Sequence, residues 1–169
     1  MKYKCVFVVG PESSGSMLIA KIISHALNID QYGEWNGAGW SDKGMHKVCH
    51  RSLPYLIPPQ YPDIDKWIHK NQHDYDIFFV IATRDITISE VSRIKRFSKT
   101  LEQVQKESKR ANEIICELIN SGQKYYIWSY ETFMFLKMDY LILLYNFLGI
   151  DSGYMPTLID GNRIALTGE

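Results

Sequence analysis

The chain has 169 residues, 46% of them hydrophobic, which predicts one globular domain, residues 1–169, with a substantial core. Its 19 basic and 19 acidic side chains give a net charge of zero, so we expect no nucleic-acid partner and no membrane partner. The three cysteines, Cys5, Cys49 and Cys116, have no metal-ligand spacing and are expected to be reduced thiols, which favours a cytoplasmic protein.

The first predicted unit is a strand, a loop and a helix. Residues 5–9 are apolar and mostly β-branched, as in a strand that is buried on both faces. Beyond the loop, Leu18, Ile22 and Ala26 recur at four-residue spacing and predict a helix. This order aims backbone N–H groups and a helix N-terminus at a phosphate or sulfate. The residues expected at such an anion are Gly10, Pro11, Ser13, Ser14, Gly15, Ser16 and Met17. A turn that only caps an ordinary helix is the alternative.

The loop has the glycine spacing of a P-loop, GxxxxGK[ST], at Gly10 and Gly15. Ser16 stands in place of the lysine, and Met17 in place of the next hydroxyl residue. P-loop kinases use that lysine on the β/γ-phosphates and that hydroxyl on magnesium. The loop therefore indicates an anion site that is not built for phosphoryl transfer.

An irregular loop is predicted over residues 28–43, because glycines recur there. Its large aromatic residues are Tyr32, Trp35 and Trp40. Long irregular loops in compact domains are often functional, so these side chains either line a wall for an acceptor or fold back over the core.

The remaining elements alternate between strands and helices. Strands are expected at residues 47–52, 76–83 and 124–129, and helices at 63–73, 87–97 and 99–121, with a further helical region that ends at Leu148. Asp63 and Asp139 are candidate helix caps. This order predicts a three-layer α/β domain with a mostly parallel sheet flanked by helices.

Strand 76–83 is nearly all apolar and should be central, and Arg84 follows it directly. Polar residues at the carboxyl end of a central parallel strand lie where α/β sheets bind ligands. A guanidinium binds phosphate in a bidentate manner, and the hydroxyl of Ser92, eight residues later, is a further donor.

Three segments resemble the sulfotransferases that use PAPS (3′-phosphoadenylyl sulfate). Ser14-Gly15-Ser16 is similar to their Ser-Gly-Thr loop, and Arg84 with Ser92 is similar to the Arg–Ser pair that grips the 3′-phosphate of PAPS. Tyr130-Glu131 and Phe147-Leu148-Gly149 resemble a third family pattern. The resemblance implies a P-loop-NTPase-like fold and spans residues 5–150.

The resemblance also implies an activity, namely transfer of a sulfuryl group from PAPS to a hydroxyl or amine of a small-molecule or carbohydrate acceptor. PAP, the desulfated nucleotide, would be the product, and no metal is expected. The 5′-phosphosulfate would lie on the loop, and Arg84 and Ser92 would hold the 3′-phosphate.

The general base and the loop cation differ from the family pattern. Ser13 stands where many members have Lys or Arg, so Arg51 or Lys47 is the candidate for the missing charge. His50, two places earlier than the family histidine, is the first candidate base, and Glu12 is the second. His46 and His50 are four residues apart, but no third ligand has a suitable spacing, so no metal site is predicted.

Two other functions stay open. One is a nucleotide kinase or NTPase with a degenerate P-loop, which needs a magnesium carboxylate, for which Asp85 is the candidate. The other is a nucleotide-binding module without catalytic activity. Nothing in the sequence indicates the oligomeric state.

Overall fold

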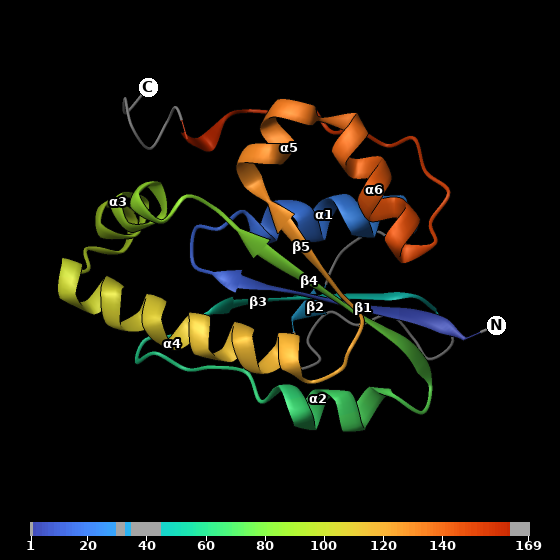
Figure 1. Ribbon diagram of the computed structural model, residues 1–169, viewed down its shortest axis with the longest axis horizontal. Coiled ribbons are helices and arrows are strands. Elements are labelled where there is room, and N and C mark those ends of the chain that lie inside the picture. The colour runs from blue at the N-terminus through green and yellow to red at the C-terminus, as the bar shows by residue number, and fades with distance from the viewer. Residues whose placement is uncertain (1, 30–32, 35–44, 163–169) are drawn as a thin grey trace.

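The computed structural model describes residues 2–29, 33–34 and 45–162 (Figure 1). The elements in chain order are β1 (Tyr3–Pro11), α1 (Ser16–Ala26), β2 (Gly33–Glu34), β3 (Lys47–Leu53), α2 (Ile64–Asn71), β4 (Tyr75–Thr83), α3 (Ile86–Phe97), α4 (Leu101–Asn120), β5 (Tyr125–Ser129), α5 (Tyr130–Leu136) and α6 (Met138–Leu148). The aromatic residues Tyr32, Trp35 and Trp40 lie outside the described residues.

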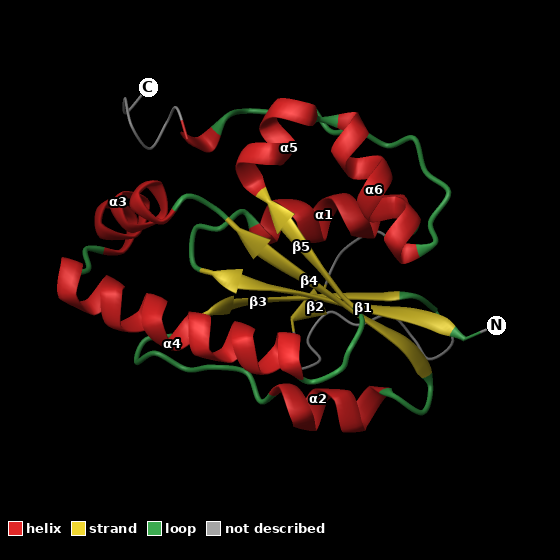
Figure 2. Ribbon diagram, in the orientation of Figure 1, coloured by secondary structure: helices red, strands yellow, loops and turns green. Residues whose placement is uncertain are grey.

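The strands form one sheet in the order β2-β3-β1-β4-β5, and every pairing is parallel. Helices α1, α5 and α6 cover one face, and α2 and α4 cover the other (Figure 2). The predicted α/β class, the three layers and the parallel sheet are therefore confirmed. The expectation that no regular structure interrupts residues 28–43 is wrong at Gly33–Glu34, which pairs with β3.

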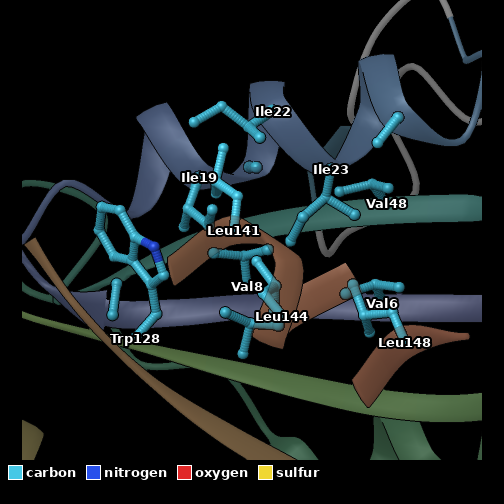
Figure 3. Close-up of a cluster of buried hydrophobic side chains, with 14 of the residues drawn as sticks. Val6, Val8, Ile19, Ile22, Ile23, Val48, Trp128, Leu141, Leu144 and Leu148 are labelled. Carbon is cyan, nitrogen blue, oxygen red and sulfur yellow. The ribbon is translucent and has the colours of Figure 1, made fainter. Parts of the chain in front are cut away.

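The central strand β1 is buried on both faces. Val6 and Val8 pack on the α1 side, Phe7 and Val9 pack on the α4 side, and all four are 0% exposed. This is the reason why the run is continuously apolar rather than alternating. Figure 3 shows Val6 and Val8 against Ile19 and Ile23 of α1 and Leu144 of α6.

Two capping predictions have different outcomes. Asp63 does cap α2, since its side chain accepts a hydrogen bond from the Lys66 N–H. Asp139 does not cap α6. That helix begins after Lys137, which has a positive φ of 53° and separates it from α5, and no side chain caps it.

None of the three cysteines forms a disulfide; Cys5 and Cys49 are buried, and Cys116 is exposed. Within the described ranges, no helix has the length and apolar character needed to cross a bilayer.

Leu143 and Leu144 provide a direct test of the core, because they are neighbours in α6 with opposite environments. Leu144 is 0% exposed and Leu143 is 55% exposed. Leu144→Ala leaves a cavity against β1 and should lower the free energy of unfolding by about 2–5 kcal/mol. Leu143→Ala should change it by at most about 0.5 kcal/mol. Urea unfolding of both variants measures the difference, and equal losses would contradict the packing described here.

Candidate functional site

The loop between β1 and α1 is a tight turn that leads into an uncapped helix start. Ser13 and Gly15 both have left-handed backbone, with φ of 65° and 85°, and the Ser14 N–H donates to the Pro11 carbonyl over 3.1 Å. Gly15 is the N-cap of α1, so no side chain caps the first N–H groups of that helix. Uncapped N–H groups at a helix start are the groups that bind phosphate or sulfate.

Gly10 allows the loop to close on the sheet. A β-carbon at this position would lie 2.4 Å from the Ala82 carbonyl oxygen and 2.6 Å from the Ser14 hydroxyl. Glycine is therefore required where the end of β1 passes β4. The Ser14 hydroxyl is buried and has no hydrogen-bond partner among the described residues.

Arg84 lies against this loop. Its Nη1 donates to the Ser13 carbonyl over 2.9 Å, and its Nε donates to Asn162 Oδ1 over 2.7 Å. The guanidinium carbon lies 4.7 Å from the centre of the Tyr130 ring. Nη2 is buried and finds no acceptor in the described part of the chain. The guanidinium is thus fixed on two sides and carries one unused donor.

Ser92 reaches the same loop residue from α3. Its hydroxyl, in a residue that is 8% exposed, donates to the Ser13 hydroxyl over 3.3 Å. One turn earlier, the Ser89 hydroxyl donates to the Glu12 carbonyl over 3.1 Å. The structure therefore brings together Arg84, Ser92 and the glycine-rich loop, three features that are far apart in the sequence. Their binding of phosphate stays a prediction.

A cavity of about 160 Å³ lies beside the loop, on the α4 side. It is lined by Pro11, Ser14, Thr83, Arg84, Ile86, Ser89, Ser108, Asn112 and Ile115. Ligand pockets usually measure about 300–1,000 Å³, so this cavity has room for part of a nucleotide and not for all of it. Two of its lining residues, Ser14 and Arg84, carry the unused donors.

His50 is also at the loop. Its Nε2 lies 2.9 Å from the Ser16 hydroxyl, across the contact between β3 and α1. His46 is elsewhere, since its Nδ1 accepts a hydrogen bond from the Lys4 backbone N–H at the start of β1. Burial, followed by the nearby Lys4 ammonium, lowers the pKa of His46.

The two candidates for the missing loop cation have different outcomes. Lys47 pairs in register with Cys5, five residues before the Gly10–Ser52 pair, which places it about 16 Å away along the sheet. The expectation for Lys47 is therefore wrong. Arg51 follows His50 directly, and because strand side chains alternate, it points to the opposite face and stacks on Tyr55. Its action at the loop stays a prediction.

Glu12 belongs to a charge cluster made of Glu12, Arg93, Lys99 and Glu107, in which Arg93 and Glu107 are buried and Glu12 and Lys99 are partly buried. Glu12 Oε2 lies 2.5 Å from Lys99 Nζ and 3.3 Å from Arg93 Nε, and both cations also contact Glu107. Arg93 is 0% exposed. A carboxylate held by two cations serves to attach the loop to α3 and α4, which favours His50 over Glu12 as the candidate base.

Sequence reasoning missed the partners of Glu12 and of Arg84. Glu107 had a detectable signal, because it stands between Val104 and Ala111 on the apolar face of α4, where a charged residue needs a buried partner. Asn162 carried no such signal, since its contact with Arg84 crosses 78 positions of the sequence.

The described residues contain no group of three His, Cys, Asp or Glu side chains arranged to hold a metal ion. Asp85 accepts a hydrogen bond from the Ile88 N–H and so caps α3. Comparisons with protein-family models and with curated proteins find no match for this chain.

Gly10→Ala tests the close approach of the loop to β4. The added methyl group would clash with the backbone carbonyl of Ala82, and the strand backbone would have to shift to accommodate it. The free energy of unfolding should therefore fall by about 1–3 kcal/mol. Gly153→Ala is the matched control, because nothing lies within 4 Å of its β-carbon position. It should change stability by at most about 1 kcal/mol, in the stabilising direction. The account is contradicted if chemical denaturation shows similar effects for both variants.

The charge cluster is tested by two glutamates of α4. Glu107→Ala leaves the buried Arg93 guanidinium without one of its carboxylates and should cost about 3–5 kcal/mol. Glu113→Ala breaks an exposed pair with Arg110 and should have little effect on stability. Thermal and urea unfolding distinguish the two, and a mild effect of Glu107→Ala would show that the cluster does not hold the loop.

Proposed function

We propose that this chain is a PAPS-dependent sulfotransferase, which moves a sulfuryl group from PAPS to a hydroxyl or amine of a small-molecule or carbohydrate acceptor. The observation that carries the proposal is the contact of both Arg84 and Ser92 with Ser13 of the glycine-rich loop. The segment that resembles the family's phosphosulfate-binding loop and the segment that resembles its 3′-phosphate-binding pair thus meet at one residue. The strand–loop–helix order at the carboxyl end of the central parallel strand supports a P-loop-like fold.

The unused donors at the loop fit the two anionic ends of such a donor molecule. PAPS carries a phosphosulfate and a 3′-phosphate on one ribose ring, so the two groups must be held close together. A buried donor without an acceptor is unfavourable by about 1–3 kcal/mol, and an anion relieves this cost. Ser14 Oγ and Arg84 Nη2 are both in that condition.

Each residue then has a distinct task. PAPS supplies the activated sulfuryl group. The backbone of residues 10–16 and the hydroxyls of Ser14 and Ser16 would hold its 5′ end, and Arg84 and Ser92 its 3′-phosphate. The Tyr130 ring and Asn162 keep the Arg84 guanidinium oriented.

We assign His50 as the general base, which accepts the proton of the acceptor's hydroxyl or amine. Imidazole exchanges protons near neutral pH, and its contact with Ser16 keeps the ring beside the loop. As the acceptor oxygen or nitrogen bonds to sulfur, its proton would pass to His50, and PAP would leave. Arg84 places positive charge at Ser13, the position where the family often has Lys or Arg.

The kinase alternative lacks such support. A kinase needs a carboxylate that is free to bind magnesium, and the Asp85 side chain caps α3 instead. A binding module without catalytic activity would use the same anion contacts, so only a turnover measurement distinguishes it from the enzyme.

Thermal unfolding with PAP tests the donor site. At a PAP concentration about 100 times Kd, binding should stabilise the folded state by about 2.7 kcal/mol, which is about 5–10 °C for a domain of this size. Arg84→Ala should abolish the shift, and Ser92→Ala should reduce it. Arg96→Ala, an exposed arginine of the same helix as Ser92, is the control and should keep it.

The alternative outcomes separate the hypotheses. A full PAP shift in Arg84→Ala shows that the 3′-phosphate lies elsewhere. A shift with ATP and magnesium alone favours the kinase. A PAP shift with no sulfuryl transfer from PAPS to any of a panel of acceptors favours the binding module.

A further inference from the structure

The segment that follows α6, residues 151–162, returns along the molecule to the candidate anion site. It runs from the end of α6 past α5 and reaches Arg84 (Figure 1). Its first part is anchored by Tyr154, whose ring stacks on the His25 ring at a centroid distance of 3.8 Å. Residues 159–160 are exposed. The contacts that the segment makes at Arg84 are thus separated from its anchor by exposed residues.

Hydrogen bonds hold the end of this segment on several sides. The Gly161 N–H donates to the Tyr130 hydroxyl over 2.7 Å. The side chain of Asn162 donates through Nδ2 to Glu131 Oε1 over 3.3 Å, and its Oδ1 accepts from Arg84 Nε over 2.7 Å. The amide of Asn162 therefore presents its oxygen to the guanidinium and its nitrogen to the carboxylate.

This docking leaves Arg84 without an accessible donor. Its Nε is engaged by Asn162, and its Nη1 by the Ser13 carbonyl. Its Nη2 has no partner among the described residues, but it is buried, and a β-carbon on Gly161 would lie 3.7 Å from it. Because the charge cluster holds the glycine-rich loop, residues 161–162 are the part that has to move before a phosphate can bind Arg84 through two oxygens.

An anion can replace Asn162 at Arg84. The amide oxygen is a neutral acceptor, whereas the oxygens of phosphate and sulfate are ionised. A hydrogen bond between two ionised groups is roughly twice as strong as one between neutral groups. The guanidinium therefore exchanges the Asn162 oxygen for the oxygen of an oxyanion when one is present.

We propose that residues 161–162 form an autoinhibitory strap, in which Asn162 occupies Arg84 until the oxyanion of a ligand displaces it. The ligand is a tetrahedral oxyanion, either free sulfate or the phosphate of a nucleotide. The proposal rests on the proposed function in one respect, the binding of an anion by Arg84. It adds that the free protein binds more weakly than its site allows, because only the fraction of molecules with an open strap is competent to bind.

Calorimetric titration of PAP and of sodium sulfate, at constant ionic strength, tests the strap in Asn162→Ala. This variant lacks the acceptor on Arg84 Nε, so more molecules are open, and it should bind both anions about tenfold more tightly than the unaltered chain. If Asn162 only orients the guanidinium, the same variant should bind more weakly. Arg84→Ala should lose binding of both anions, which locates them at this site.

Tyr130→Phe is a second variant with the same expected direction. It removes the hydroxyl that accepts the Gly161 N–H and keeps the ring that lies on Arg84, so it should also tighten binding. Asn146→Ala is the matched control, because it removes an exposed amide from α6 and should leave both affinities unchanged. Hydrogen exchange of the Gly161 amide, followed by NMR, should become faster in Tyr130→Phe and when sulfate or PAP binds to the unaltered chain.

The outcomes separate the strap from the sulfotransferase assignment. Tighter binding of sulfate by Asn162→Ala, without any binding of PAP, supports the strap and contradicts the assignment. Binding of PAP that needs Arg84 but is unchanged or weakened in Asn162→Ala supports the assignment and overturns the strap. Binding of neither anion overturns both. The strap is also overturned if exchange of the Gly161 amide is the same with and without a bound anion.

Discussion

The hydrogen bond from Arg84 to the Ser13 carbonyl joins the two halves of the candidate site. Ser13 follows β1 and Arg84 follows β4, and these strands are neighbours in a parallel sheet, so both loops emerge at the same edge. The bond places a guanidinium directly on the glycine-rich loop. If the arginine pointed elsewhere, the loop would be one isolated set of N–H groups, and no second anionic group could be held near it.

The loop is attached to α3 and α4 by a partly buried charge cluster and not by apolar contacts alone. Glu12 contacts Arg93 and Lys99, and Glu107 contacts the same two cations, so two acids and two bases balance one another. Such an arrangement adds little net stability over an apolar core of the same shape. Removing one of its charges is strongly destabilising, because the opposite charge is left without a partner, and the ion pairs form only in one relative orientation of the elements. It therefore fixes the position of the loop relative to α3, which carries Ser92.

The sequence was informative where a feature depends on local pattern. The unit of β1, loop and α1 follows from apolar runs and glycine spacing, and the order of strands and helices was enough for the α/β class. The role of Asp63 as the N-cap of α2 could also be predicted, because capping involves residues three positions apart. The position of Arg84 at the carboxyl end of a parallel strand was also predicted, whereas its contact with Ser13 depends on β1 and β4 being neighbours in the sheet.

Features that depend on strand register or on contacts between distant residues could not be predicted from local sequence patterns. Strand alternation sends His50 and Arg51 to opposite faces, and register places Lys47 at the far end of β3 from the loop, so Lys47 cannot supply the loop cation. Strand β2 has only two residues and needs β3 beside it to form at all. Asn162 contacts Arg84 across 78 positions of the sequence, and no local pattern indicates that contact.

A crystal structure of the protein grown with PAP tests the central claim most directly. The account predicts the 3′-phosphate within hydrogen-bond distance of the Arg84 guanidinium and the Ser92 hydroxyl, with the 5′-phosphate on the backbone of residues 10–16. A nucleotide seated away from Arg84, or with its 3′-phosphate in solvent, would contradict it.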